Sequence, residues 1–363
     1  MTPFETPRPP PRTAGQVLVD QLLIHGADRA FCVPGESYLE VLDALHDVQD
    51  RFTLINARHE AGAANMAEAY GKLTGKPGIC MVTRGPGARH AAIGVHIAQQ
   101  DSTPMILLVG QIGRNMTDRE AFPEVDYRQM FGGLAKWVAQ IDCPERVPEY
   151  IARAFRMATS GRPGPVVLAL PEDMLVQLRE VADAPRVEAV ESAPTQSQMD
   201  TLENLLSEAK NPLAILGGSR WSEDSVNAFA RFAEKNQLPV AVQFRRPMLF
   251  PANHPCFAGD IGLGINPKLL KRFEQADTVL LVGGRMSEVP SQSYTALSIP
   301  VPQQKLVHVH PDSQELNRVY QAQLAINATP AEFTRALGKL SIKPGTDRED
   351  LVKQAHNEYL SWS

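Results

Sequence analysis

The stretch LINARHEAGAA, residues 54–64, decides the fold of the first half of the chain. An apolar and β-branched run ends at Arg58-His59-Glu60, and small residues then begin a helix. This order predicts a strand that passes directly into a helix within an α/β sheet. Ligands of such sheets bind at the carboxyl ends of the strands, which is where Glu60 stands.

Glu60 admits two interpretations. Small apolar neighbours would shield its carboxyl group from water and raise its pKa, giving an acid that exchanges a proton with a bound heterocycle near neutral pH. Alternatively, a glutamate in the first turn of a helix only favours the positive end of the helix dipole, worth roughly 0.3–1 kcal/mol. The surrounding sequence decides between them.

Strands and helices alternate on both sides of this stretch, and Thr13 to Gln16 form a capping box that begins the first helix. We expect strands at 29–33, 52–57, 79–83, 105–110 and 166–170, and helices after Thr13, at 38–47, from Glu60 to Gly75 and at 88–99. Near-continuous apolar strands alternating with helices predict a parallel, doubly wound sheet.

A second alternating series follows a charged segment that is poor in large apolar residues. We expect its strands at 212–216, 239–243, 278–283 and 305–310, and its helices at 200–209, 223–235, 267–275 and 330–338. The fold class is therefore α/β with two doubly wound, mostly parallel sheets. The expected organisation is a disordered Pro-rich tail at 1–12, a first domain at 13–180, a linker at 181–198, a Rossmann-like domain at 199–342 and a polar tail at 343–363.

Composition excludes several classes of function. The 363 residues include 36 basic and 41 acidic residues, a balance that does not favour binding to nucleic acid or to an anionic membrane. The four cysteines form no CxxC pair, which is typical of reduced thiols in a cytoplasmic protein. No apolar run approaches the roughly 20 residues of a membrane helix.

Two further turns follow strands of the first sheet. Pro34-Gly35-Glu36 comes after the first strand, and TRGPGARH, residues 83–90, comes after the third. Glycines beside Pro86 let the backbone pass close to a ligand, and the helix that follows presents unpaired amides. Each turn alone is weak evidence, because most such turns only connect elements.

Taken together, these segments resemble a known family. VPGES, RHEAGAANMAEAYGKLTGKPG, TRGPGARH, QQDSTPMILLVGQ and EAFPEVD occur in the order found in the pyrimidine-binding domain of thiamine-diphosphate enzymes. The resemblance is to the acetolactate (acetohydroxyacid) synthase-like branch. It runs through about residues 13–175, and the second series resembles the central domain of that family.

The resemblance implies a mechanism and a set of site residues. Glu60 matches the catalytic glutamate, which hydrogen-bonds the aminopyrimidine so that its imino form takes the proton of the thiazolium carbon. The resulting ylide attacks a 2-oxo acid such as pyruvate, which leads to decarboxylation and carboligation. The positions that line the pyrimidine are Pro34, Gly35, Glu36, Thr83, Pro86 and His90, and those on the substrate side are Gln100 and Phe122. Such enzymes hold the cofactor between chains, so a homodimer or a tetramer is expected.

Four positions depart from the family pattern. Synthases commonly carry Gln where this chain has Pro123, Asn where it has His90, Gly where it has Glu36 and Ser where it has Arg84. Proline cannot donate the hydrogen bonds of a glutamine. These departures leave the fold and the cofactor in place but weaken the specific expectation of acetolactate synthesis. A related 2-oxo-acid decarboxylase or carbon–carbon lyase is the alternative.

The family holds the diphosphate and its Mg²⁺ with a third domain that carries a Gly-Asp-Gly motif. This sequence has no such motif and ends at Ser363. We therefore assign no metal ligand in this chain and expect it to be inactive alone. Three explanations stay open: a truncated product, a fragment, or one subunit of a split enzyme whose partner chain carries the diphosphate-binding domain. A catalytically silent module is the rival function.

Two features of the second series have competing interpretations. Glycine pairs at 217–218 and 283–284 follow strands and could cradle a phosphate, as in the FAD-binding synthases, but residues 285–289 lack the paired aspartates of those enzymes. We therefore favour a central domain that binds no FAD, and FAD binding stays open as the alternative. His308 and His310 alternate on one strand; we expect a partly exposed strand face rather than a metal pair.

Overall fold

The computed structural model describes residues 10–343 and 347–362. The chain divides into two compact units, one ending at Ala189 and the other beginning at Val190. Each unit has a six-stranded sheet in which every neighbouring pair of strands is parallel. The expected class, α/β with two parallel sheets, is confirmed. Most of the expected Pro-rich tail, residues 1–9, lies outside the described residues.

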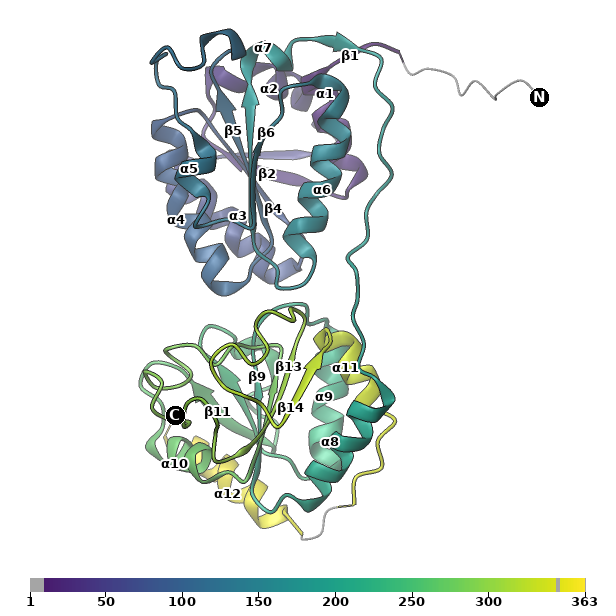
Figure 1. Ribbon diagram of the computed structural model, residues 1–363, viewed down its shortest axis with the longest axis vertical. Helices are drawn as coiled ribbons and strands as arrows, with labels where there is room; N and C mark the ends of the chain where they lie inside the picture. Colours follow the sequence, from purple (N-terminus) through teal and green to yellow (C-terminus); the bar gives the residue numbers. More distant parts are fainter. Residues whose placement is uncertain (1–9, 344–346, 363) are drawn as a thin grey trace, which may run out of the picture. The chain divides into compact units, whose positions relative to one another are not determined.

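The first unit follows the strand–helix alternation of its sequence (Figure 1). Its strands are β1 (Arg12–Thr13), β2 (Arg29–Cys32), β3 (Thr53–Asn56), β4 (Gly78–Val82), β5 (Met105–Gln111), β6 (Trp137–Gln140), β7 (Pro165–Pro171) and β8 (Leu178–Arg179). Its α-helices are α1 (Ala14–Ile24), α2 (Leu39–His46), α3 (Glu60–Thr74), α4 (Pro86–Asp101), α5 (Tyr127–Phe131), α6 (Val147–Thr159) and α7 (Glu172–Leu175). A short 3-10 turn, η1 (Glu36–Tyr38), precedes α2, and β1 pairs antiparallel with β8 apart from the main sheet.

Local sequence signals explain where these elements begin and end. Thr13 caps α1 through the expected capping box with Gln16. Gly75 ends α3 in the left-handed conformation, with φ 71°, which glycine adopts without steric strain. Strands β4, β5 and β7 are buried along their whole length, as near-continuous apolar runs predict.

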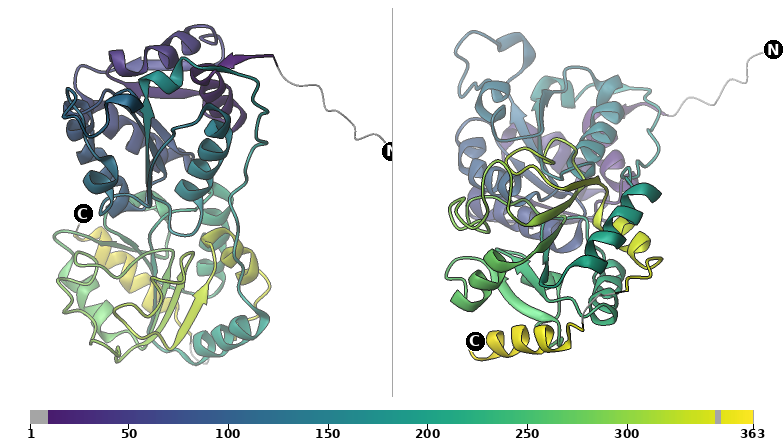
Figure 2. Two further views of the ribbon diagram at one scale, coloured as in Figure 1. Left: turned by 45° about the horizontal axis from the view of Figure 1, so that its top comes forward. Right: turned by 60° about the horizontal axis from the view of Figure 1, so that its bottom comes forward.

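Helices cover both faces of the first sheet. One core cluster joins α1, α2 and α6 to alternate strand residues, and a second joins α3, α4 and α5 to the residues between them. The left view of Figure 2 shows helices on both sides of this sheet. The sequence did not predict β6, α5 or α6; β6 has only four residues, most of them half-buried, so its apolar signal is weak.

The strand order of the first sheet is β3-β2-β4-β5-β7-β6. The chain leaves β2 for β3 on one side and then returns to place β4 on the other side of β2. This reversal makes a switch point between the carboxyl ends of β2 and β4, where open α/β sheets bind their ligands. The topology therefore predicts a binding site at the turns after β2, β3 and β4.

The second unit has the strand order β11-β10-β9-β12-β13-β14. Its strands are β9 (Pro212–Leu216), β10 (Val240–Gln243), β11 (Phe257–Ile261), β12 (Thr278–Val282), β13 (Lys305–His310) and β14 (Leu324–Asn327). Its helices are α8 (Gln196–Glu208), α9 (Glu223–Lys235), α10 (Pro267–Gln275), α11 (Pro330–Leu337) and α12 (Glu349–Leu360). The four expected strands and four expected helices are present; β11 and β14 were not expected.

Part of the expected polar tail belongs to the second unit. Helix α12 packs against β11 and α10, with Val352 and Ala355 buried and Arg348 donating hydrogen bonds to the carbonyl groups of Leu206 and Ala209. Two buried apolar side chains anchor this helix, although most of its residues are polar. Residues 344–346 and 363 lie outside the described residues.

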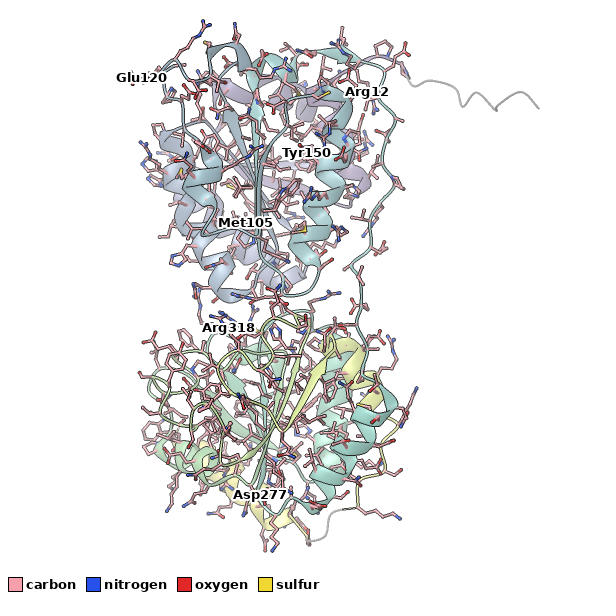
Figure 3. All side chains as sticks on the ribbon, in the orientation of Figure 1. Arg12, Met105, Glu120, Tyr150, Asp277 and Arg318 are labelled. Atoms are coloured by element: carbon pink, nitrogen blue, oxygen red, sulfur yellow. The ribbon has the colours of Figure 1, made fainter. Side chains whose placement is uncertain are left out.

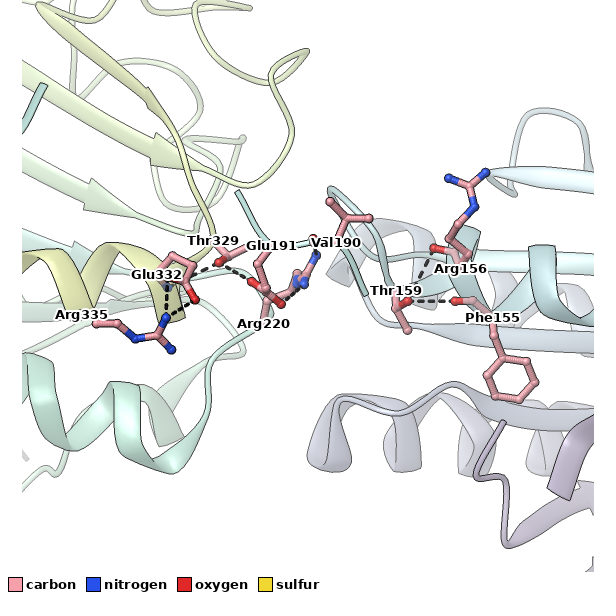
Figure 4. A network of polar contacts seen from close by, with 9 residues as sticks. All are labelled: Phe155, Arg156, Thr159, Val190, Glu191, Arg220, Thr329, Glu332 and Arg335. Atoms are coloured by element: carbon pink, nitrogen blue, oxygen red, sulfur yellow. Dashed lines mark hydrogen bonds and ion pairs between the residues drawn. The ribbon is translucent and has the colours of Figure 1, made fainter. Parts of the chain in front are cut away.

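The segment expected to be a linker enters the second unit through a polar network (Figure 4). Between Arg179 and Gln196, where every residue is described, the chain forms no helix or strand. Arg220 pairs with Glu191 and donates to the carbonyl of Val190, and Thr329 donates to the same carboxylate. These contacts fix the start of the second unit at Val190–Glu191.

Among residues 10–343 and 347–362, the helices are too short or too polar to traverse a lipid bilayer.

Candidate active site

Glu60 is the first residue of α3 and directly follows the turn after β3. His59 occupies the helix N-cap with an extended backbone, and its Nδ1 accepts a hydrogen bond of 3.1 Å from the amide of Ala61. The Glu60 side chain is 14% exposed, so its carboxylate lies at the surface of the site with most of its area covered. The predicted candidate thus stands at the carboxyl end of its strand.

The carboxylate of Glu60 has two close neighbours. Its Oε2 lies 2.9 Å from Nδ1 of His90, on the first turns of α4. Its Oε1 lies over Gly87, where an added Cβ would be 3.5 Å away. The rings of His59 and His90 stack with centroids 4.6 Å apart. The structure therefore brings Glu60 and His90, both predicted from sequence, into direct contact.

The expected rise in the pKa of Glu60 is wrong for this chain. Burial does raise the pKa, but the hydrogen bond from His90, the residue's own backbone amide and the charges of both histidines together lower it below its usual value. The small residues that shield the carboxylate from water are visible in the sequence, whereas the histidine that replaces this water is not. In the chain by itself, Glu60 is held ionised.

We expect the His90→Asn variant to raise the pKa of Glu60, because asparagine removes the histidine charge and weakens the hydrogen bond to the carboxylate. In the natural chain, the ionised form of Glu60 stabilises the fold at pH values above its unfolded-state pKa. This contribution disappears as pH falls through the lower folded-state pKa. Titrating the side-chain carboxyl carbon of Glu60 by carbon-13 NMR measures this shift.

The matched control for this titration is His96→Asn, an exposed histidine on the same helix. It should leave the pKa of Glu60 unchanged. A pKa of Glu60 that stays equally low in His90→Asn would show that His90 does not hold the carboxylate ionised.

The turns after β2 and β4 meet at the switch point. A Cβ on Gly35 would lie 2.6 Å from Cβ of Thr83, so only glycine lets the two turns approach this closely. Ser37 and Thr83 share a hydrogen bond of 2.8 Å between their hydroxyl oxygens. Pro34 and Pro86 are exposed beside this contact. The predicted residues of these two turns therefore border one surface with Glu60 and Gly87.

Two of the departures from the family pattern pair with each other. Arg84 donates to Glu172, at the start of α7, over 2.7 Å and lies 3.6 Å from the carboxylate of Glu36. Arg84 is 13% exposed, whereas Glu36 is 66% exposed. The charge that Glu36 brings to the rim of the site is thus partly balanced by Arg84. Sequence reasoning missed Glu172, because nothing in its segment indicates which turn it faces.

The predicted substrate-side residues lie differently. Gln100 is near the end of α4. Ten residues of helix separate it from His90, which corresponds to about 15 Å. Phe122 is 89% exposed in the loop after β5, whose outer part is marked by Glu120 in Figure 3. Its neighbour Pro123 does reach the site, because a Cβ on Gly85 would lie 2.8 Å from Cβ of Pro123. Within one chain, the structure does not bring Gln100 to Glu60.

In the second unit, protein atoms occupy the space beside the glycine turns. A Cβ on either Gly217 or Gly284 would lie 1.9 Å from Oε1 of Gln243, and one on Gly218 would lie 1.8 Å from the carbonyl oxygen of Gly283. These glycines are required because the β9 and β12 turns pack on each other and on Gln243. Their presence is explained without a phosphate.

The expectation of a partly exposed face at His308 and His310 is wrong, because both side chains are buried. Nε2 of His308 lies 3.0 Å from the carbonyl of Gly284, and Nδ1 of His310 accepts from the amide of Asp312. Burial lowers the pKa of His308 to about 4, so its ring is neutral and serves packing.

Comparison with known proteins identifies both units. Residues 12–130 match the model of the thiamine pyrophosphate enzyme N-terminal TPP-binding domain, and residues 199–337 match that of the thiamine pyrophosphate enzyme central domain. The chain is similar to acetolactate synthase large subunits from Corynebacterium glutamicum (28% identity, 93% of this chain and 54% of the relative) and Lactococcus lactis (30%, 94% and 60%). It is also similar to the isozyme 1 large subunit of Escherichia coli (30%, 96% and 61%). The chain therefore spans only a little over half the length of these relatives.

Proposed function

Because this chain belongs to the thiamine pyrophosphate enzyme family, whose N-terminal and central domains it carries, we propose that it binds the pyrimidine end of thiamine diphosphate at Glu60. The proposed activity is decarboxylation and carboligation of 2-oxo acids, carried out together with a domain that binds the diphosphate and Mg²⁺. The proposal concerns the reaction class and leaves the particular acid and acceptor open.

One observation carries the proposal: a single, largely covered carboxylate stands beside the switch point of the first sheet. Glu60 follows β3, the strand next to β2, and the turns after β2 and β4 border it through Gly35, Thr83 and Gly87. Ligands of open α/β sheets bind at this place, and a carboxylate there can accept or donate one proton at a ring nitrogen.

We expect a ring nitrogen of the cofactor to meet the Glu60 carboxylate beside Gly87. Gly87 leaves Oε1 of Glu60 uncovered by a neighbouring side chain, and the carboxylate is still partly exposed. Oε2 is occupied by His90, so a ring nitrogen either approaches Oε1 or displaces the imidazole. When bound, the cofactor supplies the electron sink for the carbon–carbon chemistry. Glu60 then orients the ring and holds a proton at its nitrogen.

In this proposal His90 sets the resting state of the acid. While His90 is hydrogen-bonded to Oε2, the Glu60 carboxylate stays ionised. A ring nitrogen that replaces His90 at this oxygen can share a proton with the carboxylate. A ligand that pushed His90 away would therefore raise the pKa of Glu60 toward or above its usual value. In this proposal the pKa of Glu60 depends on the bound ligand as well as on the fold.

The rim of the site departs from the family pattern, so it does not favour the particular substrate of the synthases. Glu36 and Arg84 replace small residues of the family pattern and form a pair that extends to Glu172. A related 2-oxo-acid decarboxylase or lyase accommodates this altered rim as well as a synthase does. The proposal accordingly stops at 2-oxo acids.

The proposed assembly is a homodimer or tetramer that holds the cofactor between chains, with the diphosphate-binding domain supplied either on the same polypeptide or by a separate chain. In this assembly we expect a neighbouring chain to cover the loop of Phe122, whose side chain is 89% exposed. A catalytically silent module is the rival.

Calorimetric titration of thiamine diphosphate with Mg²⁺ tests the proposal. The chain alone should bind very weakly or not at all, because the diphosphate contributes most of the charge that a binding site can recognise. Adding the diphosphate-binding domain of an acetolactate synthase relative should produce binding that depends on Mg²⁺.

Two results would contradict this account. Tight, Mg²⁺-dependent binding by the chain alone would mean that it holds the diphosphate itself. Absence of binding after the domain is supplied, with both proteins folded and associated, would favour the silent module.

A further inference from the structure

His59, Glu60 and His90 form a cluster of potential metal ligands that the sequence did not indicate. One donor atom from each residue lies within 4.8 Å of the other two. The cluster joins the N-cap of α3 to the first turns of α4, two helices that pack closely on each other. Both imidazole rings are exposed, and the carboxylate between them is partly exposed.

We propose that these three residues bind a divalent transition-metal ion of the zinc class. Two imidazoles and one carboxylate are a donor set that zinc sites use when they keep a fourth position open for water or a ligand. The inference goes beyond the proposed function, because it requires neither thiamine diphosphate nor a further domain.

The distances need only small side-chain movements. Zinc binds nitrogen and oxygen at about 2.0–2.2 Å, so its tetrahedral ligands stand roughly 3.3–3.5 Å apart. Nδ1 of His90 and Oε2 of Glu60 are now 2.9 Å apart and would separate slightly. His59 would move toward them from within 4.8 Å, which its exposed side chain permits.

The protonation of the donors is consistent with metal binding. The ion takes the place of the hydrogen between His90 and Glu60, and the imidazole carries its ring proton on Nε2 instead. Nδ1 of His59 carries a lone pair, because it accepts the hydrogen bond from the amide of Ala61. A metal ion bound to this nitrogen breaks the hydrogen bond to Ala61, which lowers the affinity for zinc. All three residues can still act as ligands.

The same donors discriminate against Mg²⁺. Magnesium prefers an octahedral set of oxygen ligands and keeps several of its waters, whereas imidazole nitrogen suits zinc, nickel and copper. The site is therefore distinct from the Mg²⁺ that accompanies the diphosphate. Because Glu60 cannot ligate a metal and hydrogen-bond a ring nitrogen at the same time, zinc and the pyrimidine should exclude each other.

The test is calorimetric titration of the tag-free, chelator-treated chain with zinc chloride, in the absence of any cofactor. We expect saturable binding of one ion per chain, and a Co²⁺-loaded sample should show the intense visible absorption of a four-coordinate site. His59→Asn and His90→Asn should each weaken zinc binding by at least about tenfold. Millimolar Mg²⁺ should not compete.

His96→Asn is the matched control, because His96 is exposed on the same helix and lies outside the cluster. Its zinc affinity should equal that of the natural chain. Circular dichroism checks that all three variants are folded. Lack of saturable zinc binding, or equal affinity in His90→Asn and the natural chain, would overturn the proposal whatever the outcome of the thiamine diphosphate experiments.

Discussion

Glu60→Gln should lower proton exchange at the thiazolium carbon of thiamine diphosphate by at least about 100-fold, once the chain is assembled with a diphosphate-binding domain. Glutamine keeps the shape of the side chain and can still form a hydrogen bond, but it cannot hold or release a proton. The measurement is the rate at which the carbon-bound hydrogen of the cofactor exchanges with deuterium, followed by proton NMR.

Glu223→Gln is the control that separates chemistry from the helix dipole. Glu223 stands in the first turn of α9, just as Glu60 stands in the first turn of α3, but it belongs to the second unit. If a first-turn charge were the whole role of Glu60, the two variants would behave alike and neither would change the exchange. Unchanged exchange in Glu60→Gln would remove this residue from the mechanism.

Gly71→Ala should destabilise the first unit by at least about 2 kcal/mol, although alanine is the better helix former by about 1 kcal/mol. Gly71 is buried in α3, and a Cβ there would lie 2.2 Å from the carbonyl oxygen of Pro104. This carbonyl is fixed, because it also accepts a hydrogen bond from the amide of Gly78. The clash therefore forces the backbone of α3 away from the start of β5.

Gly62→Ala, in the same helix, isolates the clash from helix propensity. A Cβ on Gly62 would have no neighbour within 4 Å, so this change should be neutral or stabilising by up to about 1 kcal/mol. Urea unfolding followed by hydrogen exchange of peptides from residues before Ala189 measures both variants, with peptides of the second unit as an internal standard. Equal stability of the two variants would mean that α3 does not approach β5 this closely.

Much of the fold was predictable because its strong elements carry local signals. A few neighbouring residues are enough for each of these signals. Examples are the capping box at Thr13, the left-handed Gly75 and the apolar runs of β5 and β9. Elements without such signals were missed. Strands β6 and β14 are short and only partly buried. Their positions are set by packing, which local sequence does not express.

The site was predictable in its location and less so in its chemistry. The three residues Glu60, Thr83 and Gly35 all lie at the carboxyl ends of parallel strands, as the order of the motifs implied. The pairing of Glu60 with His90 and of Arg84 with Glu36 depends on side chains from separate turns, so the pKa of Glu60 was expected to move in the wrong direction. The cluster of His59, Glu60 and His90 was missed for the same reason, since its donors come from separate segments of the chain.

The most direct test of the central claim is a crystal structure of the chain with thiamine diphosphate, Mg²⁺ and the supplied diphosphate-binding domain. We expect a pyrimidine nitrogen within hydrogen-bonding distance of the Glu60 carboxylate, beside Gly87. A pyrimidine bound elsewhere, with Glu60 still paired only to His90, would contradict it.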